Sequence, residues 1–390
     1  MRTYVRKFGT GVNGELLHAI LPPVKTVLSV FGTRPEAIKM APVLKLLSQE
    51  KSLRSLVCVT AQHRDMLDQV LGLFSITPDH DLDLMRPGQT LGDITTRALT
   101  QLGPYLEKTK PDLLLVQGDT TTTMVASLAA FYARVPVGHV EAGLRTGDPD
   151  YPYPEEVNRR ITSVLARHHF APTQRARNNL LAEGVPEASI LVTGNTVIDA
   201  LLEVVAIKPS RAPKLPLRGK RLILITAHRR ENFGAPMLEV AGAIRDLAER
   251  YADVDLVYPV HPNPNVDKPM RKELSKVPGV HLTPPLEYKA FVDLMAESYL
   301  ILTDSGGIQE EAPSLGKPVL VLRDETERPE AVEAGTVKLV GPHRRAIVSQ
   351  AAELLDSKEA YAAMARAMNP YGDGKAARRI VDRIREVLGS

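Results

Sequence analysis

The chain has 390 residues, of which 44% are hydrophobic and 24% charged, values that are ordinary for a globular enzyme of two or three domains. A net charge of +3 and the lack of any Lys/Arg block argue against a nucleic-acid-binding protein. Cys58 is the only cysteine, which excludes a disulfide framework, and no apolar run approaches the roughly 18 residues of a membrane span. We therefore expect a cytoplasmic protein without a membrane partner.

Residues 1–24 show no clear periodicity and are expected to form a flexible extension. Short apolar runs then alternate with amphipathic segments. Strands are expected at 26–31, 56–60, 112–117, 137–141, 168–171 and 190–193. Helices are expected at 35–48, 65–74, 90–108, 121–134 and 155–166. The strands are continuous apolar runs rather than alternating ones, which predicts a parallel sheet covered by helices on both faces.

A stretch rich in proline and basic residues, 208–220, is the best linker signal in the chain. The strand–helix pattern then restarts. Strands are expected at 222–226, 255–260, 280–282, 300–303, 319–322 and 337–340, with helices at 237–251, at 288–297, from 308 and at 376–388. We expect an α/β protein with two Rossmann-like doubly wound domains facing a cleft. The first domain would span 25–200 with the last helix, 375–390, packing back on it, and the second 201–374.

A Ser-Gly-Gly turn follows one of the predicted strands of the second domain. Ser305, Gly306 and Gly307 open a helix at the carboxyl edge of the sheet, where backbone N–H groups can hold a phosphate. Glycine lets a ligand approach without a Cβ in the way. Glu311, in the first turns of this helix, suits hydrogen bonds from ribose hydroxyls. An ordinary strand–helix turn is the alternative, but the charged loop 323–330 follows the next strand on the same edge, which favours a binding site.

The first domain has a comparable turn. Gly32, Thr33 and Arg34 follow its first strand, and Pro35 takes a favoured first helical position. Arg34 and Lys39 can both point at an anion, although solvated basic residues at a helix start would give the same pattern. No GxGxxG or GxxxxGK[ST] motif is present, so neither a dinucleotide cofactor nor an NTPase site is expected.

Three carboxylates lie at the carboxyl edge predicted for the first sheet. Asp119 follows a buried strand in QGDTTTT, Glu141 ends the next strand in HVEAGLRTGD, and Glu155 opens a helix in YPYPEEVNRR. Open α/β sheets bind ligands at this edge. Asp119 could instead cap a helix and Glu155 oppose a helix dipole. A carboxylate at the end of an apolar strand costs free energy unless it is paired or hydrogen-bonded, so Glu141 is expected to have such a partner or a functional role. No HxH, HExxH or DxD motif is present, so no metal site is expected.

Histidines follow two strands of the second domain. His228 comes directly after the strand at 222–226, and His261 after the strand at 255–260. Both would lie on the cleft edge. His228 can donate a hydrogen bond, carry a charge or act as a general acid near neutral pH. A loop histidine near prolines explains His261 equally well.

Together these segments resemble the bacterial non-hydrolysing UDP-N-acetylglucosamine 2-epimerase family, from about Thr26 to the carboxyl terminus. The segments are FGTRPEAIKMAPV, TAQHRDMLDQVL, QGDTTTT, HVEAGLRTGD, PYPEEVNRR, TAHRREN and TDSGGIQEEAPSLGKPVLVLRDETERPEAVEAGTVKLVG. The resemblance implies a glycosyltransferase-B-type fold, a homodimer, no cofactor, and interconversion of UDP-N-acetylglucosamine and UDP-N-acetylmannosamine for cell-surface polysaccharides.

The family route also implies roles for the residues. C2 of this sugar has no adjacent carbonyl, so the family eliminates UDP from C1 as the C2 proton leaves, and adds it back to 2-acetamidoglucal. By resemblance, the catalytic residues are Asp119, Glu141, Glu155 and His228. The UDP-binding residues would be Arg34, Lys39, His228, Ser305, Gly306, Gly307, Glu311 and Arg328. Which carboxylate acts as the base in each direction stays open.

Some family members are activated by a second substrate molecule beside the active site. Gln62, Glu155, Arg229 and His261 match the positions associated with that site. Three other functions remain open: a hydrolysing epimerase that releases N-acetylmannosamine and UDP, a glycosyltransferase of the same fold, and a nucleotide-sugar-binding protein without activity.

Overall fold

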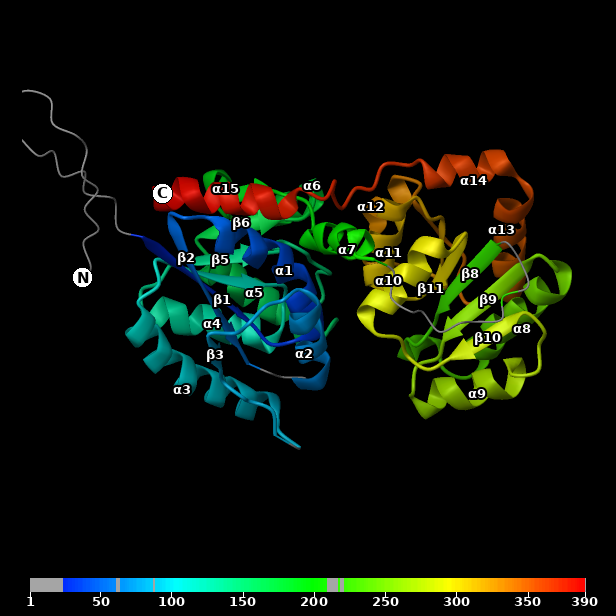
Figure 1. The fold of residues 1–390 in the computed structure, drawn as a ribbon, viewed down its shortest axis with the longest axis horizontal. Helices are drawn as coiled ribbons and strands as arrows, with labels where there is room; N and C mark the ends of the chain where they lie inside the picture. The colour runs from blue at the N-terminus through cyan, green and yellow to red at the C-terminus, as the bar shows by residue number, and fades with distance from the viewer. Residues whose placement is uncertain (1–23, 61–63, 87, 209–216, 218–220, 390) are drawn as a thin grey trace, which may run out of the picture.

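The computed structural model describes residues 24–60, 64–86, 88–208, 217 and 221–389. They form two α/β domains side by side (Figure 1). The first sheet has the order β3-β2-β1-β4-β5-β6-β7 and all its strand pairs are parallel. Its strands are β1 (Lys25–Phe31), β2 (Leu53–Val59), β3 (His80–Asp81), β4 (Leu113–Gln117), β5 (Val137–Val140), β6 (His168–Ala171) and β7 (Ile190–Val192).

Helices cover both faces of this sheet. They are α1 (Arg34–Gln49), α2 (Arg64–Leu73), α3 (Leu91–Thr109), α4 (Thr121–Tyr132), α5 (Glu155–Leu165), α6 (Gln174–Ala182) and α7 (Thr196–Ala206). α3 and α4 pack against each other and close one core with the sheet, while α1, α2 and α7 contribute to a second core. The strand interiors are almost fully buried, which explains why they are continuous apolar runs.

The second domain repeats this plan. Its sheet has the order β10-β9-β8-β11-β12-β13, again with parallel pairs. Its strands are β8 (Arg221–Thr226), β9 (Val254–Pro259), β10 (Val280–Thr283), β11 (Leu300–Thr303), β12 (Val319–Val321) and β13 (Val337–Leu339). Its helices are α8 (Ala235–Arg250), α9 (Pro264–Leu274), α10 (Tyr288–Glu297), α11 (Gly306–Glu311), α12 (Pro329–Glu333), α13 (Arg344–Asp356) and α14 (Lys358–Ala365). The predicted pair of doubly wound domains is confirmed.

One helix joins the cores of the two domains, and the last helix packs back on the first domain. α7 packs against α1 of the first domain and against α10 and α11 of the second, so that one apolar core continues across the domain boundary. The last helix, α15 (Ala376–Leu388), lies along α1 and α7 (Figure 1). Asp199 accepts hydrogen bonds from the first N–H groups of α15, those of Ala376 and Ala377, at 3.2 and 2.9 Å. The chain therefore returns to the first domain after completing the second.

Two predictions lie largely outside the described residues: the extension at 1–24 and the linker at 208–220. Within the part of the chain that is described, no helix is long and apolar enough to cross a membrane.

Candidate functional site

A cavity of about 600 Å³ lies between the domains, and we call it the Arg34 cavity. Its lining joins the start of α1 to the strand ends and loops of the second domain. The lining residues used below are Arg34, Lys39, His228, His261, Tyr288, Ser305, Gly307, Glu310, Glu311 and Arg328. Seven of the eight predicted UDP-binding positions thus face one cavity, and the eighth, Gly306, is part of the same turn.

Arg34 and Lys39 reach this cavity because of how α1 begins. Thr33 caps the helix and Glu36 closes a reciprocal capping box. The buried Glu36 carboxylate accepts hydrogen bonds from the N–H groups of Gly32 and Thr33 at 3.0 and 2.7 Å. A Cβ on Gly32 would lie 1.9 Å from the Thr60 hydroxyl, so only glycine fits there. The turn is therefore held from inside, and the basic side chains are left to face the cavity.

The Ser305-Gly306-Gly307 turn is held in the same way by a buried acid. Asp304 is fully buried and accepts the backbone N–H groups of His228 and Arg229, each at 2.7 Å. This contact joins the loop after β8 to the loop after β11. α11, which follows, is only six residues long. A Cβ on Gly306 would lie 3.5 Å from Cζ of Arg328, so that the guanidinium packs directly on the turn.

Glu141 is the centre of a buried cluster. Its backbone is in the left-handed region, with φ of 65°, which is strained for a residue other than glycine. Lys39 donates to both of its carboxylate oxygens at 2.7 and 2.6 Å. The amides of Gln117 and Asn195 also donate to the carboxylate, the latter at 3.1 Å. Burial opposes the charge on Lys39, but Glu141 and Glu310 outweigh it and raise the pKa of Lys39. Glu141 thus has the partners that its buried position requires.

Asp119 lies on the neighbouring strand end, next to this cluster. Arg159 donates to its carboxylate at 2.6 Å, and Asn158 donates to its backbone carbonyl at 3.0 Å. Burial raises the pKa of Asp119 and nearby Glu141 adds to the rise, while the ion pair with Arg159 opposes it. The helix that follows is capped by Thr120, so Asp119 is not the cap. A carboxyl group with a raised pKa suits proton transfer.

Glu155 begins α5, and Asn158, one turn later, brings this end of the helix against Asp119. Glu155 lines neither the Arg34 cavity nor the second cavity described below. The structure therefore brings α5 to the site, but it does not place the Glu155 side chain in contact with Glu141 or Asp119.

His228 and His261 stack on each other, with ring centroids 5.4 Å apart. Burial lowers the pKa of His228, although the carboxylate of Asp304 opposes this, so the neutral form is favoured. A neutral imidazole can donate one hydrogen bond to a phosphate oxygen or accept a proton. His261 is exposed and Arg229 is engaged through its backbone with Asp304. Gln62, the remaining predicted member of a second substrate site, lies outside the described residues.

The carboxyl group of Glu311 faces the cavity and holds its proton more tightly than an ordinary glutamate does. Burial raises its pKa to about 8, and the neighbouring Glu310 adds to this. Tyr288 is buried on the same wall and its hydroxyl has no hydrogen-bond partner among the described residues. The guanidinium of Arg34 lies 6.0 Å from the Tyr288 ring. These groups form a polar surface whose hydrogen bonds are incomplete and which a ligand can complete.

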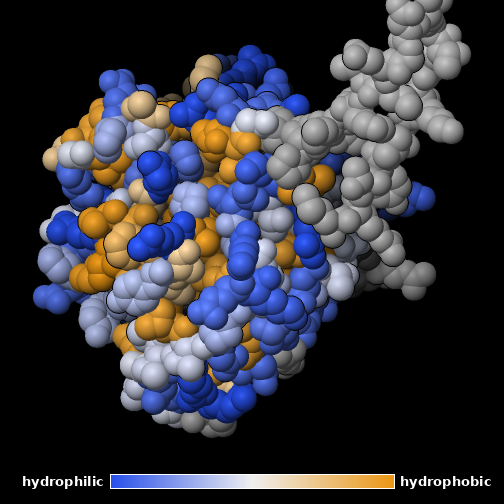
Figure 2. Space-filling view, turned by 90° about the vertical axis from the view of Figure 1, so that its left-hand side faces the viewer, coloured by the Kyte–Doolittle hydropathy of each residue, from blue (hydrophilic) through white to orange (hydrophobic). Residues whose placement is uncertain are grey.

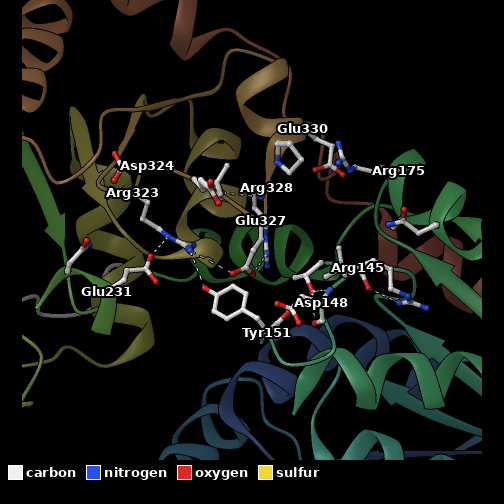
Figure 3. A pocket seen from close by; sticks show the side chains of 18 of the residues that line it. Arg145, Asp148, Tyr151, Arg175, Glu231, Arg323, Asp324, Glu327, Arg328 and Glu330 are labelled. Carbon is white, nitrogen blue, oxygen red and sulfur yellow. Dashed lines mark hydrogen bonds and ion pairs between the residues drawn. The ribbon is translucent and has the colours of Figure 1, made fainter. Parts of the chain in front are cut away.

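A second cavity, of about 710 Å³, lies on another side of the domain interface (Figure 3). Arg328 lines both cavities, so the two meet at its side chain. In Figure 3, Arg323 and Glu327 of the second domain face Tyr151 of the first, and Arg323 donates to the Tyr151 hydroxyl at 3.5 Å. The charged loop 323–330, which the sequence singled out as part of a binding site, lines this cavity, but the sequence did not predict that it faces Arg145 and Tyr151 of the first domain across a second cavity.

Sequence reasoning also missed several partners of the predicted residues. They are Gln117, Arg159, Asn195, Tyr288 and Glu310. Gln117, Arg159 and Glu310 all lie within the motifs given above, and Glu310 is directly beside Glu311. The GNT sequence at 194–196 was the one available signal for Asn195, since asparagine is a frequent helix cap.

Comparison with known proteins adds to this geometry. A profile of the family described as UDP-N-acetylglucosamine 2-epimerase matches residues 45–385. The chain belongs to this family.

Relatives of the chain carry the same name. It is 58% identical over 364 residues to the UDP-N-acetylglucosamine 2-epimerase of Yersinia pestis, with 91% of this chain and 97% of the relative covered. It is 57% identical over 366 residues to a probable UDP-N-acetylglucosamine 2-epimerase of Ralstonia solanacearum, with 92% and 98% covered.

A solved structure supports the same assignment. The Neisseria meningitidis UDP-GlcNAc 2-epimerase bound to UDP-GlcNAc superposes with a TM-score of 0.85 at 54% identity, covering 93% of this chain and 100% of that one. The resemblance inferred from the motifs is confirmed, and with it the fold.

Proposed function

We propose that this protein interconverts UDP-N-acetylglucosamine and UDP-N-acetylmannosamine by eliminating and re-adding UDP, and that it supplies precursors for cell-surface polysaccharides. One observation carries the proposal: Glu141 and Lys39 form a buried ion pair at the wall of the Arg34 cavity, in a member of the 2-epimerase family. The pair places a carboxylate base beside a cavity equipped for a nucleoside diphosphate.

The reaction has two separable demands. A base takes the proton from C2, and the electron pair of that C–H bond forms a C1=C2 double bond. At the same time the C1–O bond breaks, and its electron pair leaves with UDP. Return of a proton to the other face of C2 and of UDP to C1 completes the inversion. In our proposal Glu141 or Asp119 handles the proton on each face, with Glu155 on the same edge. The cationic and N–H groups of Arg34, Lys39, His228, Arg328 and the 305–307 turn stabilise the departing diphosphate, and Glu311 binds the ribose.

A proton NMR spectrum of the pure protein with UDP-N-acetylglucosamine tests this function. We expect a mixture with UDP-N-acetylmannosamine, without NAD or added metal. Free N-acetylmannosamine and UDP would instead support the hydrolysing epimerase. Unchanged substrate would contradict both, and sugar transfer to an added acceptor would favour a glycosyltransferase.

We also propose a homodimer formed through the first domain. α5 buries a polar side, including Asn158, Thr162 and Ser163, and leaves Val157, Ile161 and Val164 on its outer side. Val164 is 85% exposed, and α4 beside it exposes Phe131 and Tyr132. Figure 2 looks onto the first domain from the side opposite the second and shows apolar side chains exposed among polar ones. An apolar stripe on the outside of a helix supports a protein interface there.

Three further points belong to the proposal. The domain boundaries at 25–200 with 375–390 and at 201–374 are supported by the membership of the two sheets. A cytoplasmic location is supported by the single, buried Cys58. A second, activating substrate molecule is supported by His261, which lines the Arg34 cavity beside His228. The proposal also assigns Gln62, Glu155 and Arg229 to that site, of which Glu155 and Arg229 lie outside the lining of this cavity.

A further inference from the structure

The side-chain amide of Asn195 connects two buried carboxylates. Asn195 is 2% exposed and precedes α7, where its Oδ1 accepts the N–H of Val197 at 3.1 Å. This bond identifies the other atom as the nitrogen, because an N–H needs an oxygen acceptor. Nδ2 lies 3.1 Å from Oε1 of Glu141 and 2.8 Å from Oε2 of Glu310. Both hydrogens of the amide are therefore used, one on each carboxylate.

The partners of this amide belong to different domains. Glu141 follows β5 of the first domain, whereas Glu310 lies on α11, directly after the Ser305-Gly306-Gly307 turn of the second. Glu310 is 2% exposed, and its other oxygen accepts Nε of Arg328 at 2.6 Å. A continuous chain of hydrogen bonds thus runs from Glu141 through Asn195 and Glu310 to Arg328, the side chain shared by both cavities.

Asn195 is itself held firmly. Its backbone N–H donates to the carbonyl of Tyr371 at 2.7 Å, in the segment that returns to the first domain. The amide is neutral and offers two donors from one atom, which is what two facing carboxylates need. Aspartate has the same shape and the same capping oxygen but no N–H to donate, and it would add a third negative charge.

We propose that Asn195 is a positioning residue for epimerisation: it orients the Glu141 carboxylate and ties that orientation to Glu310 on the phosphate-binding side of the cleft. The inference rests on the proposed function, in which Glu141 transfers the C2 proton. Glu310 follows the Ser305-Gly306-Gly307 turn and binds Arg328, so Asn195 links the position of the Glu141 carboxylate to the position of the turn that receives the diphosphate.

The decisive variant is Asn195→Asp, since aspartate caps a helix as well as asparagine does. We expect kcat to fall roughly 10-fold to 100-fold, the scale of a misplaced catalytic group, with KM and UDP affinity within about twofold of wild type. The acidic limb of the pH profile of kcat should move to higher pH, because an added negative charge makes neighbouring acids hold protons more tightly. A purely structural role would lower the melting temperature without moving this limb. Asn178→Asp, on the exposed side of α6, is the matched control and should change none of these quantities.

Two further variants keep the test decisive. Asn195→Ser retains a capping oxygen without adding charge, so it should lose kcat even if Asn195→Asp does not fold. Glu310→Gln provides an amide that can donate to aspartate at 195, so the double variant Asn195→Asp/Glu310→Gln should turn over faster than Asn195→Asp alone.

The outcomes separate the two proposals. A wild-type protein that does not epimerise contradicts the proposed function. If wild type is active and either folded Asn195 variant keeps its kcat and pH profile, the positioning role is wrong. If the fold-loss of kcat in the double variant equals the product of the fold-losses in the two single variants, Asn195 and Glu310 act independently. That result would overturn the link between them.

Discussion

Lys39 donates to both oxygens of the Glu141 carboxylate, at 2.7 and 2.6 Å, and the two side chains are only 19% and 4% exposed. The charge of Lys39 is therefore already engaged before any diphosphate arrives. Arg34, one turn earlier on α1, lines the same cavity and forms no salt bridge with the residues that the structure describes. The two basic residues of α1 that line the cavity thus differ: Lys39 is already paired with Glu141, whereas Arg34 is free to meet the ligand.

Arg34→Ala should therefore weaken UDP binding with little effect on folding. Loss of a charge-assisted hydrogen bond costs about 1.5–3 kcal/mol, which corresponds to roughly a 10-fold to 100-fold rise in the Kd for UDP. Isothermal titration calorimetry measures this directly. Arg54→Ala, on the exposed side of β2, is the control. Equal affinities for wild type and Arg34→Ala would show that the diphosphate lies elsewhere.

Gly307→Ala tests the close approach of the ligand to the turn. A Cβ at this position would meet Oε1 of Glu311 at 3.6 Å, an ordinary contact, so the protein itself tolerates it. We expect an unchanged melting temperature and UDP binding weakened by about tenfold or more, because a methyl group would occupy the space of a phosphate oxygen. Gly103→Ala in α3, where a Cβ meets nothing within 4 Å, is the matched control. Retained UDP affinity in Gly307→Ala would mean that no ligand atom packs on this glycine.

Glu311 predicts a pH dependence of UDP binding. Its pKa is raised to about 8 by burial, with Glu310 adding to the rise, so it is largely protonated at pH 7 in the free protein. Ribose hydroxyls donate to the ionised form, so binding should release a proton below pH 8. UDP affinity should consequently rise between pH 7 and pH 9 and then level off. Calorimetry of UDP binding in several buffers that differ in ionisation enthalpy measures how many protons are released on binding.

Glu311→Gln is the control for this pH dependence, since it keeps the shape and cannot ionise. The variant should bind UDP with an affinity that changes less over the same range. Identical pH profiles for the variant and wild type would contradict the assignment of Glu311 to the ribose.

The sequence alone predicted six of the seven strands of the first sheet, all six strands of the second, and the edges at which the site lies. Parallel strands buried on both faces are continuous apolar runs, and every polar residue directly after such a run lies on the ligand-binding edge. This reasoning located Asp119, Glu141 and His228 correctly at strand ends. This reasoning needs only the order of apolar and polar residues along a short segment, and that order is clear in these strands.

Several helices were missed. α7 (TVIDALLEVVA) is a mostly apolar segment that packs between the two domains, and it was not recognised as a helix. α9 contains Pro264 at its start and Pro269 in its interior, which resembles a loop in the sequence. α6, α12, α13 and α14 were likewise not predicted, and neither was the two-residue strand β3.

The partners of Glu141 could not have been predicted from local pattern. Asn195 is 54 residues away from Glu141 and 115 residues away from Glu310. Their contact depends on how the second domain is set against the first through α7, which is a property of packing between domains rather than of any segment.

Val164→Asp tests the proposed dimer. A charge on the outer stripe of α5 should convert the dimer to a monomer without unfolding it, because Val164 is 85% exposed in the single chain. Light scattering gives the mass of both proteins. Val332→Asp, at a partly exposed position of the second domain, is the control and should leave the mass unchanged. A monomeric wild type, or a Val164→Asp protein with the mass of a dimer, would contradict an interface at this stripe.

The last prediction concerns the proton at C2. Epimerisation in D2O should place deuterium at C2 of the product, because the proton removed from one face passes to solvent and the acid on the other face delivers a solvent-derived deuteron. Glu141→Gln keeps the shape and the bond from Asn195 but cannot take the proton, so turnover should fall by roughly 100-fold or more. UDP affinity should persist, since the Arg34 side of the cavity is unchanged, although Lys39 loses its ionic partner. NMR of the product and calorimetry with UDP measure both quantities. Protium retained at C2 would exclude exchange with solvent, and wild-type turnover in Glu141→Gln would transfer the role of base to Asp119 or Glu155.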